Sequence, residues 1–385
     1  MKKNYTQMVM VFIGLFFVSS FSNTLAPFIT TIKSSYNVSS ELIAILPSVV
    51  FIAASIMNVL GFKLISFLGL KKGLIVSIST CITSSIIIFF SKSFYILLIG
   101  YFISGLGIGM SYLFLSTILS LLPKEYQKFS LFNAFFGLGG ILSLPIARLI
   151  ILNHVPFNYT YLIHITTLSI YLIFVFKLEN TPKVNSKFAW SDFGSVLKNP
   201  LVLYFAFAIF FYVGAETSTT NWTGSFLERY YGISTAEVPN ILLGFWILFT
   251  TGRVFGDSFI NKIGHLKLLI ISSFGAVCGI AIILTGSLKI QAFIGIALIG
   301  IMISIMYPAI QSYMVQSVSI DDVPATSAMI GVFNSLGSMI LTYVIGICGN
   351  IKVSYVFIIQ IFFYAYIAFV SSKFLIKHYN KENQR

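Results

Sequence analysis

The chain consists of long apolar stretches separated by short polar breaks. A helix that crosses the ~30 Å hydrocarbon core of a membrane needs about 20 apolar residues. The first stretch is longer than the apolar region of a signal peptide, and further stretches follow it, so we expect an uncleaved first helix. Stretches of sufficient length predict twelve transmembrane helices, at residues 8–31, 42–65, 73–91, 95–122, 129–152, 160–177, 200–222, 238–260, 267–288, 290–318, 324–347 and 352–376.

Composition supports an all-α integral membrane protein. Of the 385 residues, 57% are hydrophobic and 9% are charged, whereas a soluble domain carries about 25% charged residues. With twelve spans, the side of the membrane that holds both termini has 17 of the 24 Lys and Arg residues, and the other side has five. The positive-inside rule therefore predicts cytoplasmic termini. The net charge of +13 reflects this topology and does not indicate nucleic-acid binding.

The residue types that build metal centres and active sites are scarce. Cys81, Cys278 and Cys348 fall inside apolar spans without metal-ligand spacing, so we expect no metal, cofactor or redox role. Four His and eleven acidic residues show no cluster at a membrane face. A polytopic membrane enzyme, which needs such a cluster, is therefore disfavoured.

An internal repeat divides the chain into two halves. The longest polar break predicts a cytoplasmic linker at 178–199 between six-helix bundles at 1–177 and 200–385. Such repeats place a substrate site near the membrane midplane between them. Phe132-Asn133 matches Phe333-Asn334 at an offset of 201. At an offset of 195 the identical pairs include Gly61 and Gly256, Gly69 and Gly264, Lys72 and Lys267, Gly105 and Gly300, and Tyr112 and Tyr307.

Two short motifs resemble those of a known transporter family. Glycine-rich, Lys-bearing turns follow spans two and eight, and the second is preceded by Gly252-Arg253-Val254-Phe255-Gly256-Asp257. With the 6+6 repeat, these resemble the major facilitator superfamily, which implies its twelve-helix fold of two pseudo-symmetric bundles and transport by alternating access. Tyr212-Val213-Gly214-Ala215-Glu216 is similar to the seventh-span motif of the fucose/glucose/galactose permease branch. Proton-coupled members of that branch use acids in spans one and four, where this chain has Asn23 and no acid, respectively.

Glu216 is the most informative residue, because a charge near mid-bilayer costs at least ~2.5 kcal/mol and is rarely kept without a partner or a task. It lies 16 residues past Pro200, roughly 24 Å along a helix, which predicts a position in the outer half of the span. Our hypothesis is that it takes up and releases a proton, accepts hydrogen bonds from a hydroxylated substrate, or both; a purely structural carboxylate is the alternative. Trp222 and Tyr212 are candidates for stacking on a sugar ring, although a Trp at a helix end also serves as an interfacial anchor.

Polar residues at helical spacing complete the predicted site. Tyr112, Tyr307 and Gln311 either line a cavity or bond between helices, since hydrocarbon does not solvate them. The small residues beside them, such as Gly105 and Gly109, permit close helix packing. The predicted substrate-binding set is Asn23, Tyr112, Asn133, Tyr212, Glu216, Trp222, Tyr307, Gln311 and Asn334.

Three further charged residues are candidates for gating or charge pairing. Arg148, in the fifth span, either snorkels to the outer surface, pairs with Glu216, or captures an anionic substrate. Arg253 and Asp257 stand at i and i+4 at the cytoplasmic end of the eighth span. They predict either a gate at the inner mouth or an ordinary helical ion pair worth ~0.3–0.5 kcal/mol.

The sequence as a whole favours a monomeric secondary active transporter in the cell membrane, surrounded by lipid. Its expected substrate is a small polar solute, by preference a sugar, taken up with a proton. The alternative is a proton-coupled exporter of drugs or metabolites. The exporter is disfavoured because Gly137-Leu138-Gly139-Gly140 in the fifth span is followed only by an isolated Pro145, without the Gly-Pro signature usual in superfamily antiporters.

Overall fold

The computed structural model describes residues 2–38, 40–43, 45–177, 194, 196, 198–233 and 238–382, and no strand occurs among them. Most of the predicted linker at 178–199 lies outside the described residues, and the division of the chain at this linker stays a prediction. The chain forms two compact units. The first contains Met1–Lys128, Phe135–Ser195 and Val318–Val332, and the second contains Phe129–Ala134, Val196–Ser317 and Phe333–Arg385.

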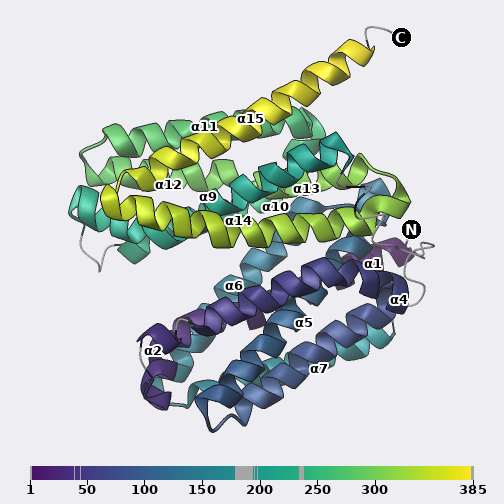
Figure 1. Cartoon of the computed structure of the whole chain (residues 1–385), viewed down its shortest axis with the longest axis vertical. Coiled ribbons are helices and arrows are strands. Elements are labelled where there is room, and N and C mark those ends of the chain that lie inside the picture. Colours follow the sequence, from purple (N-terminus) through teal and green to yellow (C-terminus); the bar gives the residue numbers. More distant parts are fainter. Residues whose placement is uncertain are drawn as a thin grey trace. The chain divides into compact units, whose positions relative to one another are not determined.

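In the first unit, α4 lies against α5 and α7 (Figure 1). It consists of two helical stretches that meet at a kink, where Gly69 has a non-helical backbone, and these stretches cover most of the predicted spans 42–65 and 73–91. The helices of this half are α1 (Lys2–Ser22), α2 (Leu25–Tyr36), α3 (Ser40–Ile43), α4 (Ile45–Phe89), α5 (Phe94–Ser120), η1 (Lys124–Tyr126), α6 (Phe129–Leu152), η2 (Phe157–Tyr159) and α7 (Thr160–Phe176).

In the second unit, α15 lies against both α9 and α11, and α10 lies against α12 (Figure 1). The first six residues of α6 also belong to this unit, while α14 begins in the first unit and continues in the second. The helices of this half are α9 (Pro200–Tyr231), α10 (Val238–Ile263), α11 (His265–Thr285), α12 (Lys289–Ser304), α13 (Met306–Gln316), η3 (Ile320–Asp322), α14 (Val323–Ile351) and α15 (Tyr355–Glu382).

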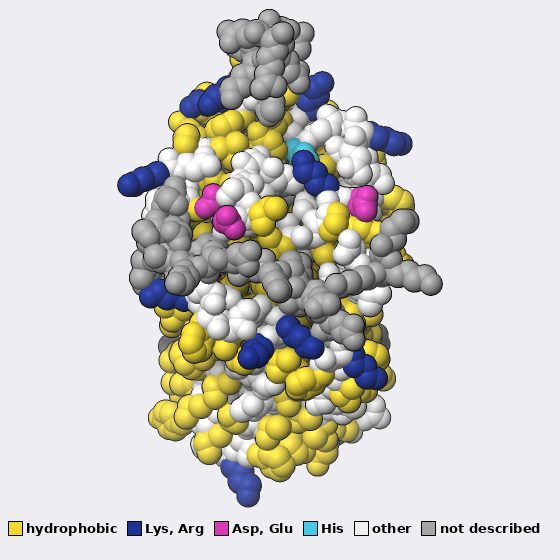
Figure 2. Space-filling view, turned by 90° about the vertical axis from the view of Figure 1, so that its right-hand side faces the viewer, with side chains coloured by type: hydrophobic (Ala, Val, Ile, Leu, Met, Phe, Trp, Pro, Cys, Tyr) yellow, Lys and Arg dark blue, Asp and Glu magenta, His cyan; other side chains and the backbone are white. Residues whose placement is uncertain are grey.

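These helices account for the predicted transmembrane spans. Ten helices among the described residues are long and apolar enough to cross a membrane. The first part of α4 adds the shorter apolar helix Ile45–Asn58, and α10 covers the predicted eighth span. Figure 2 shows a face that is largely covered by apolar side chains, with Lys and Arg side chains spaced apart. The all-α, twelve-helix architecture of two six-helix bundles is confirmed.

The backbone repeats the internal symmetry predicted from the sequence. Gly69 has φ 69° and ψ 168°, and Gly264, 195 positions later, has φ 85° and ψ 151°. This combination of dihedral angles is essentially restricted to glycine. Both turns therefore need a glycine at the same place in the repeat.

Close helix packing is repeated at the same offset. A Cβ atom added to Gly105 of α5 would lie 2.3 Å from the carbonyl oxygen of Val50 in α4. One added to Gly300 of α12 would lie 3.0 Å from the carbonyl oxygen of Phe245 in α10. Glycine thus lets the backbones of the paired helices touch in each half, as small residues do between membrane helices.

We expect Gly105→Val to lower the free energy of unfolding by about 1–3 kcal/mol, because the added side chain forces α5 away from the α4 backbone. Thermal and denaturant unfolding of the purified protein in detergent would measure the change. Ile99→Val on the same helix, where the side chain is 55% exposed, is the control and should change stability little. Equal stability of Gly105→Val and wild type would contradict the packing argument.

Candidate functional site

Glu216 lies at the middle of α9. The helix begins at Pro200, where the Asn199 side chain accepts a hydrogen bond from the Leu201 amide at 3.0 Å, and it continues to Tyr231. Sixteen residues therefore precede Glu216 and fifteen follow it. The helix extends nine residues past the predicted end at 222, and the position of Glu216 in the outer half of the span stays a prediction.

The Glu216 carboxylate forms an ion pair with Arg253 of α10. Arg253 Nη2 lies 3.2 Å from Glu216 Oε1, and the two side chains are 6% and 18% exposed, respectively. Arg253 is ten residues before the end of α10, and its position at the cytoplasmic end of the span stays a prediction. Opposite charges at this distance offset part of the cost of removing both from water.

Neutral groups hold the guanidinium of Arg253 from several other sides. Its Nε donates to the carbonyl oxygen of Ser304 at 3.3 Å, and its Nη1 donates to that of Asn133 at 3.5 Å. Nη2 also donates to the Tyr212 hydroxyl at 3.5 Å, and the guanidinium carbon lies 4.1 Å from the centre of the Phe249 ring. The arginine therefore keeps polar and aromatic contacts that do not depend on the charge of Glu216.

Asp257 contacts the first turn of α6 within the second unit. Its two carboxylate oxygens accept hydrogen bonds from the backbone amides of Ser130 at 3.1 Å and Leu131 at 2.9 Å. A carboxylate is stabilising at this position, because the amides at a helix N-terminus lack intrahelical partners and carry partial positive charge. The role seen for Asp257 is thus to hold a helix end.

The glycines of the segment 252–257 explain how α10 approaches its neighbours. A Cβ on Gly252 would lie 2.0 Å from Ser304 Oγ, and one on Gly256 would lie 2.0 Å from Ser130 Oγ. Ser130 Oγ also donates to the Arg253 carbonyl oxygen at 2.7 Å. The two glycines therefore bring α12 and the first turn of α6 onto α10, on either side of Arg253.

Several predicted substrate-binding residues gather in the second unit. Asn133 Nδ2 donates to Gln311 Oε1 at 3.2 Å, and both side chains are buried. The rings of Tyr212 and Tyr307 lie 5.9 Å apart. We call Asn133, Tyr212, Glu216, Arg253, Tyr307 and Gln311 the Glu216 cluster.

Trp222 contacts α14. Its indole Nε1 donates to the carbonyl oxygen of Thr342 at 3.2 Å, and its ring fills the space left by the missing side chain of Gly346. The indole therefore takes part in packing between α9 and α14. Asn334 lies on the same α14 and is half-buried.

Three other predicted residues belong to the first unit. Asn23 follows the end of α1, where its side-chain amide donates to the carbonyl oxygen of Ser19 at 2.9 Å. Tyr112 is half-buried on α5. Arg148 is part of α6, but its side chain lies outside the described residues.

Sequence reasoning missed two polar residues of α15. Gln360 Oε1 accepts a hydrogen bond from Thr219 of α9 at 2.9 Å, and Tyr364, one turn later, is fully buried. Their signal in the sequence is a polar pair at i and i+4 within the apolar first half of the helix. This spacing places both side chains on one face.

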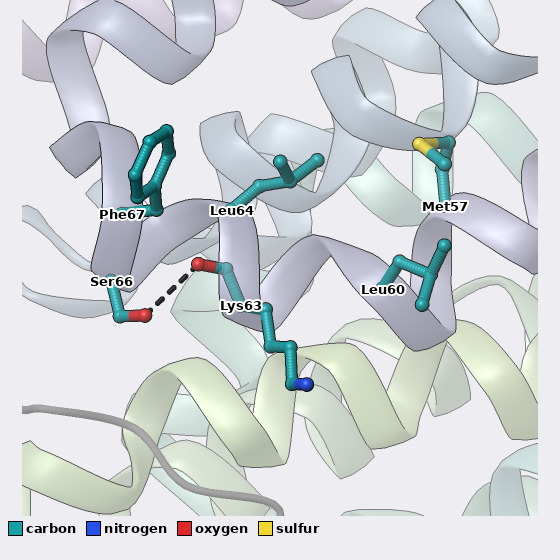
Figure 3. Close-up of a pocket in the computed structure, with 6 residues that line it drawn as sticks. All are labelled: Met57, Leu60, Lys63, Leu64, Ser66 and Phe67. Carbon is teal, nitrogen blue, oxygen red and sulfur yellow. Dashed lines mark hydrogen bonds between the residues drawn. The ribbon is translucent and has the colours of Figure 1, made fainter.

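A surface pocket of about 500 Å³ lies on α4 of the first unit (Figure 3). Ser66 Oγ donates to the backbone carbonyl of Lys63 at 2.9 Å on its polar side. The pocket contains none of the residues predicted to bind a solute. It is lined by Met57, Leu60, Lys63, Leu64, Ser66 and Phe67.

Comparisons with known proteins agree with this architecture. The model of the Major Facilitator Superfamily matches residues 11–342 and 225–384. An uncharacterized MFS-type transporter of Yersinia pestis is 31% identical over 99 residues, and the alignment spans only 26% of this chain and 26% of that relative.

Solved transporter structures share the fold. The fucose:proton symporter FucP of Escherichia coli has a TM-score of 0.82 at 19% identity, over 96% of this chain and 98% of that one. The proton:xylose symporter XylE, bound to 6-bromo-6-deoxy-D-glucose, has a TM-score of 0.81 at 12% identity, over 97% and 96%. The human organic anion transporter MFSD10 has a TM-score of 0.77 at 14% identity, over 96% and 99%. The chain thus belongs to the major facilitator superfamily and is a multi-pass membrane transporter, not an enzyme.

Proposed function

We propose that this transporter takes up a small hydroxylated solute, by preference a sugar, together with a proton, and that Glu216 carries the proton. The observation that carries this proposal is the carboxylate of Glu216 at the middle of α9, 3.2 Å from Arg253 and largely shielded from solvent. A carboxylate kept at this depth is more often functional than incidental. Two of the transporters that share the fold are described as sugar:proton symporters.

The contacts of Arg253 suggest how a proton is carried. When Glu216 binds a proton from the outer solution, its attraction to the guanidinium falls. The arginine still has the carbonyl oxygens of Ser304 and Asn133 and the ring of Phe249 as partners. When the proton leaves toward the cytoplasm, the ion pair forms again. One proton is thereby moved per cycle without leaving a buried charge unsolvated.

The groups around Glu216 suit a solute that carries several hydroxyls. The carboxylate accepts hydrogen bonds, the amides of Asn133 and Gln311 both donate and accept, and Tyr212 and Tyr307 add aromatic surface. A sugar presents hydroxyls along its edges and apolar faces on its ring. The distribution of Lys and Arg supports cytoplasmic termini. We also propose that the protein works as a monomer in the cell membrane.

Uptake by purified protein in proteoliposomes tests the proposal. Labelled hexoses, pentoses and sugar acids would be offered with and without an inward proton gradient, with protein-free liposomes and a protonophore as controls. We expect saturable uptake of at least one neutral sugar, and its accumulation only when the gradient is present. Absence of both sugar uptake and sugar counterflow would contradict the proposal and favour the exporter.

A further inference from the structure

Contacts between α9 and α15 show that the two helices run antiparallel. Thr219 of α9 is hydrogen-bonded to Gln360 of α15 at 2.9 Å. Fifteen residues earlier in α9, the Tyr204 hydroxyl accepts a hydrogen bond from Lys373 Nζ at 2.8 Å. Residue numbers therefore fall along α9 as they rise along α15.

This register brings Tyr364 to the level of Glu216. Glu216 is three residues before Thr219, and Tyr364 is four residues after Gln360, so both lie one helical turn from the same contact, in the same direction. Glu216 therefore has Arg253 of α10 at 3.2 Å, shares that guanidinium with Tyr212 of its own helix, and lies at the level of Tyr364 of α15.

The hydroxyl of Tyr364 is buried without a partner, as are ten other side-chain oxygens of the described residues. The side chain is 0% exposed, and its oxygen has no hydrogen-bond partner among the described residues. A buried hydroxyl without a partner is costly, and such groups are rare in native proteins. A hydroxyl of this kind beside a titratable carboxyl suggests that it gains its partner in another protonation state.

We propose that Tyr364 is a positioning residue for the proton, and that its oxygen accepts a hydrogen bond from the protonated carboxyl of Glu216. While Glu216 is ionised, its carboxylate pairs with Arg253, and the Tyr364 hydroxyl has no partner among the described residues. A proton from the outer solution then forms an O–H bond on Glu216, and this new donor needs an acceptor, which Tyr364 supplies. The ion pair with Arg253 weakens, and no other covalent bond forms or breaks. This inference rests on the proposed role of Glu216 in proton coupling.

The test compares Tyr364→Phe with Tyr366→Phe on the same helix. Tyr366 is the matched control because its hydroxyl donates to the carbonyl oxygen of Tyr204 at 3.3 Å, away from Glu216. Removing the acceptor for the protonated form weakens proton binding, so the pH midpoint of proton-driven uptake should move down by about half a unit to one unit in Tyr364→Phe. The KM for solute counterflow at equal pH should stay within about twofold of wild type.

Infrared difference spectroscopy of the purified protein separates this inference from the proposed function, because it needs no solute. The protonated-carboxyl band of Glu216 is identified by its loss in Glu216→Gln and then titrated with pH. A band that moves to lower pH in Tyr364→Phe, but not in Tyr366→Phe, supports the inference. A wild-type band that Tyr364→Phe leaves in place, or that both variants move equally, overturns this inference alone. The absence of any titrating Glu216 band overturns the proposed function as well.

Discussion

Glu216→Gln should abolish accumulation of solute against its gradient while leaving solute exchange intact. In a symporter that moves one proton per solute, an inward gradient of about two pH units supports accumulation of up to ~100-fold, since each unit corresponds to a factor of ten. Gln preserves the size of Glu216 and most of its hydrogen bonds but cannot carry the proton. The expected accumulation ratio therefore falls to about one, whereas counterflow of the same solute continues.

Glu228→Gln provides the matched control for this experiment. Glu228 is on the same helix but is exposed near its end, so its neutralisation should leave the accumulation ratio unchanged. Both variants would be compared in proteoliposomes at equal protein density. Gradient-driven accumulation that survives in Glu216→Gln would show that another group carries the proton.

Arg253→Met should lower the free energy of unfolding by about 3–5 kcal/mol, which is the usual cost of leaving a buried charge without its partner. The double variant Arg253→Met, Glu216→Gln should recover most of that loss, because neither charge then remains. Chemical unfolding of the purified protein in detergent, at a pH where carboxylates are ionised, would measure the two values. The recovered free energy of unfolding measures the contribution of the ion pair separately from the packing of the Arg253 side chain.

Arg229→Met is the control for charge removal as such. Arg229 is an exposed residue of α9 whose Nη1 donates to the carbonyl oxygen of Gly349 at 3.2 Å, and its replacement should cost little. If the effects of Arg253→Met and Glu216→Gln simply added, the buried pair would not be the source of the stability.

The helices were predictable from apolar length alone, because a membrane core accepts little else than a helix of about 20 residues. The breaks within the helices were less predictable from the sequence. The predicted spans 42–65 and 73–91 are separated by a kink at Gly69 and not by a loop. The span at 290–318 is divided into α12 and α13 near Ile305, because Pro308 has no N–H to donate to the carbonyl oxygen of Ser304, which accepts from Arg253 Nε instead.

The sequence singled out individual candidate residues of the site, but it did not show which residues pair with one another. Glu216 stood out because a charge in an apolar segment is costly. Its ion-pair partner Arg253 did not stand out, because it is 37 positions away in the sequence. Asp257, at i+4 from Arg253, was the more obvious partner for that arginine. Asp257 instead meets two backbone amides of α6, and a backbone amide has no signature in the sequence.

The glycine contacts between α4 and α5, and between α10 and α12, constrain how the protein moves. At Gly105 the contact is made by main-chain atoms, and at Gly300 main-chain atoms again take part. A main-chain contact has no side-chain rotamer to change, so it cannot yield gradually as an ordinary packed surface can. Each of these helix pairs should therefore behave as one rigid body during the transport cycle. The rearrangements of the transport cycle must then take place at contacts between side chains, where repacking costs little free energy.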